Sequence, residues 1–364
     1  MGKVGTAAAA AGAFSLTGGF PHILRGNTAH GATKNFKGQS IRVLTWTDES
    51  GKAAVKHIIQ PFQAMTGAKV IPDLTAATSE MVAKVKASAA KPQFDVIILS
   101  GVGAIELAKA GLLQKPDLKL IPNINRVFPN MRTAADGYCI GYYLWCEGLV
   151  YNTKTLSRPP ESYGVLWDPK HKGRIYLPPP QFTQAMELTI AAARMAGGSM
   201  KNPEPGFKKL EELKDSVLTL GENPPQVAEL FRANVLDVGG VESPLMFPNY
   251  IRNPSYNMSA TLDLKEGFFY DLQFMVIPKN HPGNDEVAHA LIDYALDPVV
   301  QGKMAEAVWY GPINQDTKIP QTAAEFPFIP TPKTIRDRGI TLDLEYLASV
   351  RSDWIRRYTE IFGM

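Results

Sequence analysis

Short apolar runs alternate with amphipathic segments over residues 41–110. Ile41–Trp46 and Phe94–Leu99 are almost wholly apolar, which is typical of parallel strands buried on both faces. Ala68–Pro72 is a third such run, and a stretch with helical spacing of apolar residues separates each run from the next. This order of strand and helix predicts a parallel sheet whose faces are covered by helices.

The same alternation returns over residues 174–241. Strands are predicted over Arg174–Leu177 and Leu236–Val241, and helices over Gln184–Ala196, Pro205–Leu218 and Gln226–Arg232. A chain of 364 residues, with 45% hydrophobic and 20% charged residues, is long enough for two domains that each have a core.

Two further segments carry a pattern of their own. Gly141–Leu156 is an aromatic-rich strand that runs into a turn, and Leu166–Leu177 follows it. Together they resemble the extracellular solute-binding proteins of ABC importers, most of all the branch that binds spermidine and putrescine. The resemblance implies an α/β, two-lobed periplasmic-binding-protein fold of type II. In that fold each lobe is a mainly parallel sheet covered by helices, and two crossover strands join the lobes, here near residues 143–148 and 270–275.

The resemblance also sets the expected boundaries. Residues 1–36 are expected to be signal and linker. The first lobe is expected to take residues 37–143 together with 274–320, and the second lobe residues 144–273. Residues 321–364 are expected to form a C-terminal helical extension, helical over Thr341–Ile361, that packs across the outside.

The N-terminus favours export. Thr6–Leu16 is apolar and rich in alanine but too short to span a bilayer. It suits the central region of a secretory signal with a cleavage region near Ala29–Ala32. Low hydrophobicity is typical of twin-arginine signals, yet no Arg-Arg pair is present, so we expect the true signal to begin further upstream. The mature protein would then be periplasmic. The alternatives are a short buried helix or a disordered tail.

The net charge limits the classes of partner that the protein is expected to bind, and the two cysteines leave two states open. The formal net charge is +3 and no cluster of Lys and Arg stands out, which gives no support to nucleic-acid binding. The expected partners are a small-molecule solute and an inner-membrane ABC permease, with the protein itself a monomer. A membrane receptor that senses the solute is the alternative to transport. Cys139 and Cys146 are either two buried thiols or a disulfide that export would permit.

Signatures of catalysis are weak. Gly101–Gly103 lacks the further glycine and the lysine of a phosphate-binding loop. Two cysteines and six scattered histidines form no zinc pattern, so neither a metal nor a cofactor is predicted. The rival class is an enzyme on the same scaffold that uses Cys146, beside Glu147, as its nucleophile. The direction of the Cys146 side chain, toward or away from the cleft, distinguishes the two classes.

A binding site between lobes needs aromatic faces and a few oriented polar groups. Ligands of parallel sheets lie beyond the carboxyl ends of the strands. An ammonium ligand pairs with carboxylates and lies against rings through cation–π contacts. On these grounds, and on the resemblance, the predicted ligand-binding residues are Trp46, Asp48, Ser100, Tyr143, Trp145, Gln181, Glu242, Tyr270, Asp271 and Gln273.

Four of these residues have a simpler alternative. Asp48 suits the N-cap of the following helix, and Trp145 suits the core. Glu242 suits a solvated loop. Tyr143 suits the solvent side of a strand, because neighbours on a strand alternate between faces.

The exact solute stays open. Trp46 matches the tryptophan that follows the first strand in the polyamine-binding branch. That branch has aromatic residues after the third strand, where this chain has Gly101-Val102, and an acidic pair where this chain has Pro180–Phe182. A polyamine such as spermidine or putrescine is the predicted solute. An amino-acid-like zwitterion, an aminophosphonate and ferric ion are the alternatives.

Overall fold

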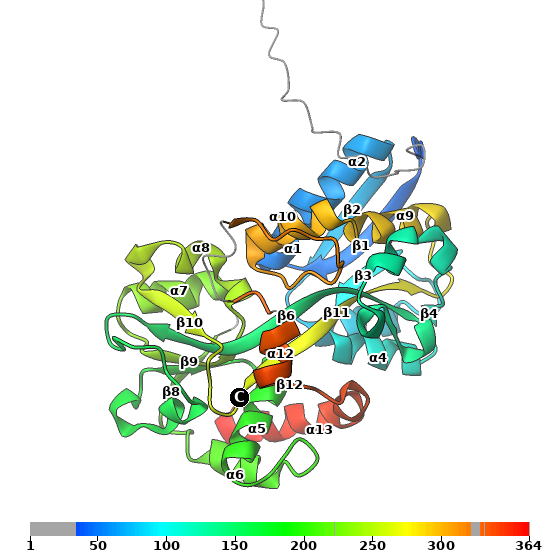
Figure 1. Ribbon diagram of the computed structural model, residues 1–364. Coiled ribbons are helices and arrows are strands. Elements are labelled where there is room, and N and C mark those ends of the chain that lie inside the picture. The colour runs from blue at the N-terminus through cyan, green and yellow to red at the C-terminus, as the bar shows by residue number, and fades with distance from the viewer. Residues whose placement is uncertain (1–33, 222, 322–327, 331, 364) are drawn as a thin grey trace, which may run out of the picture. The chain divides into compact units, whose positions relative to one another are not determined.

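The computed structural model describes residues 34–363 apart from 222, 322–327 and 331 (Figure 1). The predicted export signal lies outside the described residues. None of the helices in the described part of the chain combines the length and the apolar character that a membrane span requires.

Strands and helices alternate at the start of the chain, as predicted. In chain order the elements are β1 (Ser40–Trp46), α1 (Glu49–Ala54), α2 (Gln60–Thr66), β2 (Lys69–Thr75), α3 (Thr78–Ala87), β3 (Val96–Leu99) and α4 (Gly101–Lys109). A short π-helical stretch, Val55–Ile59, joins α1 to α2. β1 pairs in parallel with β2 and β3. β2 is the edge of the sheet, where Pro72, which has no N–H to donate, is tolerated. We call these elements, together with α9 (Asp285–Ala295) and α10 (Pro298–Val308), the first half.

A second α/β set follows further along the chain. It contains β7 (Ile175–Leu177), α5 (Thr183–Met195), α6 (Glu204–Glu211), β8 (Val217–Leu220), α7 (Pro224–Arg232), β9 (Val238–Glu242), α8 (Pro248–Ile251) and β10 (Met258–Thr261). β7 pairs in parallel with β8 and β9. We call this set the second half.

One predicted helix in the second half is too long. The helix predicted over Pro205–Leu218 ends at Glu211, and Val217–Leu220 forms β8 beside β7. Val217, Leu218 and Leu220 fit helical spacing and a short strand equally well, so periodicity alone did not separate the two.

Two long antiparallel strands join the halves. β6 (Cys139–Asn152) pairs with β11 (Phe268–Pro278) over its first part and with β9 over its last part. The sheet order β2-β1-β3-β11-β6-β9-β7-β8 therefore passes through both halves by way of β6 and β11, which run side by side across the centre of Figure 1. All fourteen residues of β6 are buried, which explains its aromatic and apolar composition.

The two cysteines are free buried thiols, not a disulfide. Both lie on β6, with Cys139 at its first residue. A strand rises about 3.3 Å per residue, so a straight strand holds residues seven apart far beyond the roughly 6 Å that a disulfide spans.

The chain ends in the helix α13 (Leu344–Phe362). Asp343 accepts a hydrogen bond from the Tyr346 N–H and caps its start, and Gly363 ends it in the left-handed region at φ 74°. The shorter elements are β4 (Leu113–Gln114), β5 (Thr133–Ala134), α12 (Pro332–Arg338) and β12 (Gly339–Ile340).

Candidate ligand-binding site

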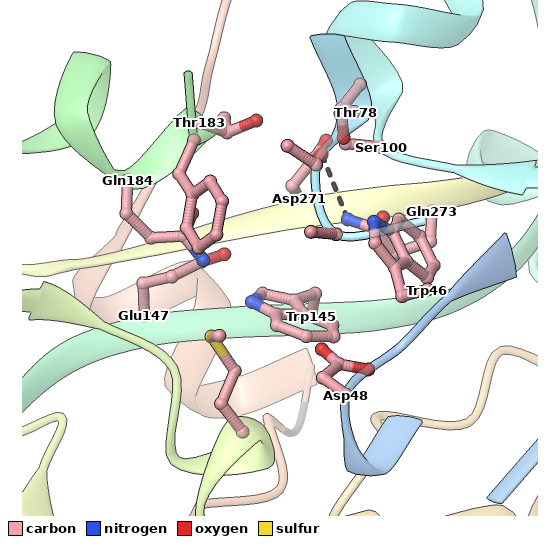
Figure 2. Close-up of a pocket in the computed structure, with 14 residues that line it drawn as sticks. Trp46, Asp48, Thr78, Ser100, Trp145, Glu147, Thr183, Gln184, Asp271 and Gln273 are labelled. Atoms are coloured by element: carbon pink, nitrogen blue, oxygen red, sulfur yellow. Dashed lines mark hydrogen bonds between the residues drawn. The ribbon is translucent and has the colours of Figure 1, made fainter. Parts of the chain in front are cut away.

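A pocket lies where β6 and β11 pass between the halves (Figure 2). The first half contributes the ends of β1 and β3 and the start of α3. The second half contributes the start of α5. The lining residues are Trp46, Asp48, Ala76, Ala77, Thr78, Ser100, Trp145, Glu147, Phe182, Thr183, Gln184, Met246, Asp271 and Gln273.

Asp48 both caps a helix and lines the pocket. Its Oδ1 accepts hydrogen bonds from the Ser50 N–H at 3.0 Å, the Gly51 N–H at 3.1 Å and the Ser50 hydroxyl at 2.5 Å. Burial nevertheless raises its pKa above the ordinary value for an aspartate. The two interpretations of Asp48 made from the sequence are therefore compatible.

Aromatic rings form one wall of the pocket. The ring centroids of Trp46 and Trp145 are 6.2 Å apart, and both rings line the cavity, as Figure 2 shows. Tyr143 is buried away from the pocket lining and stacks on Tyr310, with ring centroids 3.4 Å apart. It lies neither in solvent nor at the pocket, because it packs behind Trp145 with Tyr310 and Tyr142.

Asp271 projects from β11 onto the N-terminus of α4. Its Oδ2 accepts hydrogen bonds from the Gly101 N–H at 3.0 Å and from Gln273 Nε2 at 3.1 Å, the second drawn in Figure 2. A Cβ at position 101 would lie 2.6 Å from Asp271 Oδ1, so a glycine there permits this close approach. Oδ1 has no hydrogen-bond partner among the described residues, and burial raises the pKa of Asp271 to about 7.

Two buried glutamates have carboxylate oxygens without a partner among the described residues. Glu147 follows Trp145 on the same face of β6, and one of its carboxylate oxygens has no partner within the described chain. Glu187, on α5, is fully buried, and neither of its oxygens has one. Burial and the nearby charge of Glu187 raise the pKa of Glu147, and burial with the charges of Asp271 and Glu242 raises that of Glu187.

None of the fourteen lining residues is Lys, Arg or His. The arrangement is thus a buried set of carboxylates and indole rings that has no cation of its own among the lining residues. It has the chemistry of a site for a cation.

A profile of the family described as "Bacterial extracellular solute-binding protein" matches residues 57–327. The chain belongs to this family. It is therefore a solute-binding protein of ABC transporters and not an enzyme, as predicted.

Two characterised relatives are similar over most of their length. The chain is 24% identical to spermidine/putrescine-binding periplasmic protein 1 of Haemophilus influenzae over 305 residues, covering 80% of each chain. It is 22% identical to the γ-aminobutyric acid-binding protein of Pseudomonas aeruginosa over 348 residues, covering 87% of this chain and 89% of the relative.

Solved structures confirm the predicted fold class. A spermidine/putrescine ABC transporter substrate-binding protein of Streptococcus pneumoniae superposes with a TM-score of 0.67 at 21% identity, covering 89% of this chain and 99% of that one. A binding protein of A. tumefaciens in complex with agropinic acid superposes with a TM-score of 0.73 at 20% identity, covering 90% and 99%. These likenesses show the fold and not the ligand.

Cys146 in this solute-binding protein faces away from the pocket. Trp145 and Glu147 on either side of it line the cavity, so the thiol points to the opposite face of β6. Its Sγ donates a hydrogen bond to the Phe328 carbonyl at 2.9 Å, and burial raises its pKa well above the ordinary value. A thiol kept protonated and out of the cleft is not a nucleophile. The alternative of an enzyme using Cys146 is therefore wrong.

Six of the ten predicted ligand-binding residues line one pocket, and four lie outside its lining. Tyr143 is one of these four. Glu242 accepts hydrogen bonds from the Tyr176 hydroxyl at 3.2 Å and the Ser243 N–H at 3.0 Å, and burial raises its pKa to about 8. It is buried and not a solvated loop residue.

Tyr270 alternates with Asp271 on β11 and shares a hydrogen bond with the Thr341 hydroxyl at 3.0 Å. Gln181 does not line the pocket, whereas the next residue, Phe182, does.

The predicted ligand set did not include Glu147 and Glu187. Glu147 lies with Tyr143 and Trp145 on the predicted crossing strand, but the predicted ligand-binding set leaves it out. Glu187 carried one signal, since it is a charged residue inside a helix whose other residues from Thr183 to Ala193 are apolar or uncharged and all buried. A charge on a buried helix face requires a partner.

Proposed function

We propose that this protein is exported to the periplasm, binds a small diamine or polyamine in the pocket and delivers it to an inner-membrane ABC permease. The observation that carries the proposal is the set of buried carboxylates without a basic residue in the lining. Asp48, Glu147 and Asp271 line the cavity, and Glu187 lies behind them.

Buried carboxylates are costly unless they are paired. Moving an ionised carboxylate out of water requires hydrogen-bond donors and positive charge in exchange. The ammonium groups of a diamine supply both, with three N–H donors each. The faces of Trp46 and Trp145 add cation–π contacts, each worth about 0.5–2 kcal/mol.

Asp271 also argues against a ligand carboxylate at one position. The N-terminus of a helix carries a partial positive charge and free N–H groups, which suit an anion. At the start of α4 the Gly101 N–H already donates to the protein's own carboxylate. A ligand anion placed there would face Asp271 at close range.

A second candidate is an amino-acid-like zwitterion. α3 and α5 both begin at the pocket, and neither start has a side-chain cap. Thr78, Thr183 and Gln184, which line the cavity there, would face the carboxylate of such a ligand. The γ-aminobutyric acid-binding relative gives this candidate further weight.

Calorimetric titration of the purified protein with putrescine, spermidine and γ-aminobutyrate tests the proposal. We expect saturable binding of putrescine or spermidine and far weaker binding of γ-aminobutyrate. The carboxylate ligand succinate serves as the negative control. Tight binding of γ-aminobutyrate with none of the diamine would replace the proposed solute by the zwitterion.

A further inference from the structure

Helix α13 lies against both halves of the protein. It packs on α4 of the first half and on α5 and α6 of the second half, and it appears in red at the bottom of Figure 1. It comes from the last part of the chain, beyond both crossing strands. When the halves move apart, a helix in this position must lose its contacts with one of them and keep its contacts with the other.

The contacts with the second half are extensive and well formed. Arg357 makes two parallel hydrogen bonds to the Glu204 carboxylate, at 2.6 and 2.9 Å, and lies 3.7 Å over the Phe207 ring. Trp354 packs edge-on against Phe207, and the buried Tyr358 hydroxyl donates to the Pro178 carbonyl at 3.0 Å. Such bidentate and aromatic contacts hold the helix to the second half.

The contacts with the first half run along α4, and their side-chain pairs include two ion pairs. Arg351 Nη1 lies 3.3 Å from Glu106 Oε2 on α4, and the side chain of Arg351 is only 7% exposed. Lys109 pairs with Glu345 at 3.5 Å through exposed side chains. Leu344 adds an apolar contact near Gly101. We infer from this difference in kind, bidentate and aromatic contacts against ion pairs, that α13 travels with the second half.

The same arginine reaches the edge of the pocket. Arg351 Nη2 donates to the Gln181 carbonyl at 3.4 Å, and the Ser79 hydroxyl on α3 donates to the same carbonyl at 3.4 Å. Phe182, the next residue, begins the pocket lining of the second half. One carbonyl of the second half is therefore held by a residue of the first half and by the arginine that pairs with α4.

We propose that Arg351 is a positioning residue that latches the closed arrangement of the halves by joining α4 to the Gln181 loop. When the halves separate, its bond to Glu106 must break while the aromatic contacts of α13 stay intact. The latch thus sets the fraction of protein that is closed in the absence of solute. Apparent affinity scales with that fraction, so the latch tightens binding without touching the solute. The affinity part of this inference rests on the proposed function, whereas the latch itself does not.

The test measures the separation of the halves directly. Lys56 in the first half and Gln226 in the second are both exposed. Substituting them as Lys56→Cys and Gln226→Cys allows spin labels to be attached, while Cys139 and Cys146 are buried. Pulsed electron paramagnetic resonance then gives the distance distribution between the labels. The comparison is made between the parent, Arg351→Met, which keeps an unbranched side chain, and Arg357→Met, which removes a contact to the second half only.

We expect Arg351→Met to shift the solute-free distribution toward longer distances and to weaken putrescine binding by about 5- to 30-fold, mainly through faster dissociation. Arg351→Lys should restore part of both effects. Arg357→Met should lower the melting temperature and leave the distances unchanged. If Arg351→Met does not fold, Glu106→Gln removes the same ion pair from a partly exposed position.

Unchanged distances in both Arg351→Met and Glu106→Gln would overturn the latch. Because the distances are measured without solute, this outcome is separate from the failure of the proposed function. If putrescine binds none of the proteins, the proposed solute fails, and the distance comparison still decides the role of Arg351.

Discussion

Two pairs of carboxylates, three of them in the pocket lining and Glu187 behind it, differ in the hydrogen bonds that the protein offers them. Asp48 and Asp271 accept hydrogen bonds from backbone N–H groups at the starts of α1 and α4, and from the side chains of Ser50 and Gln273. At Glu147 and Glu187, three of the four oxygens have no partner among the described residues.

This difference in hydrogen bonding indicates which carboxylates have a structural role and which have a role in binding. Asp48 and Asp271 hold helix starts and β11 in place whether or not a solute is present. Three of the four oxygens of Glu147 and Glu187 gain no hydrogen bond from the described residues, and burying them destabilises the protein without solute. Such a cost is common at binding sites, where the missing partner is the ligand. The comparison predicts that the second pair contributes most to solute affinity.

The largest effect is expected for Glu187→Gln. The amide keeps the shape but removes the charge, so putrescine affinity should fall by about 10- to 150-fold, the range for a hydrogen bond to a charged group. The melting temperature of the solute-free protein should rise, because a neutral amide is less costly to bury. Calorimetry and thermal unfolding measure the two quantities. Glu211→Gln, at an exposed position of α6, is the matched control. Equal affinities for the two variants would contradict the comparison.

A change of pH should have the next largest effect. Burial raises the pKa of Asp271 to about 7 and that of Glu242 to about 8, so the two groups lose their protons between about pH 6 and about pH 9. A cation prefers the ionised forms, and we expect putrescine affinity to rise about tenfold over this interval, with protons released on binding. Calorimetry at pH 7 in two buffers of different ionisation enthalpy counts those protons. Affinity that falls as the pH rises would exclude a cationic solute beside Asp271.

The same groups change stability in the opposite direction. Their folded-state pKa lies above the unfolded value, so the folded protein binds more protons than the unfolded chain. Their contribution to the free energy of unfolding is fully present below about pH 4. It is lost as the pH rises through about 7 and about 8. Comparing the pH dependence of unfolding between the parent and Asp271→Asn isolates the share of Asp271.

A smaller effect is expected for the aromatic wall. Trp46→Ala removes one cation–π face, which corresponds to a loss of about 2- to 30-fold in putrescine affinity. Trp46→Phe should lose less, since it keeps a ring. Both are measured by calorimetry at a single pH. An affinity unchanged in Trp46→Ala would remove Trp46 from the binding site while leaving the role of the carboxylates intact.

The smallest effect is expected for Cys146→Ala. The thiol faces away from the pocket, so putrescine affinity should stay within about twofold of the parent while the melting temperature falls, because the Phe328 carbonyl loses its donor. A loss of affinity as large as that of Glu187→Gln would show that the two faces of β6 are coupled.

The pattern of apolar positions was sufficient for the alternating strands and helices, whereas the two-lobed fold class and the two crossing strands were predicted from the resemblance to solute-binding proteins. Strand and helix periods are local properties of the chain, and the long apolar runs of β6 and β11 reveal burial on both faces. It was not sufficient for β8, where a few residues fit both periods.

The binding site, like the fold, was predicted in part from the sequence and decided in part by the tertiary structure. Trp46, Asp48 and Ser100 were predicted because strand ends are visible in the sequence, and the structure brings them to the pocket. Only the tertiary structure decided three other features of the site. These are the face of β11 that carries Asp271, the stacking of Tyr143 on Tyr310, and the proximity of Glu187 to the other carboxylates. Those outcomes depend on strand register and on packing between segments far apart in the chain, and a one-residue change of register would turn Tyr143 and Asp271 to the other face of the sheet.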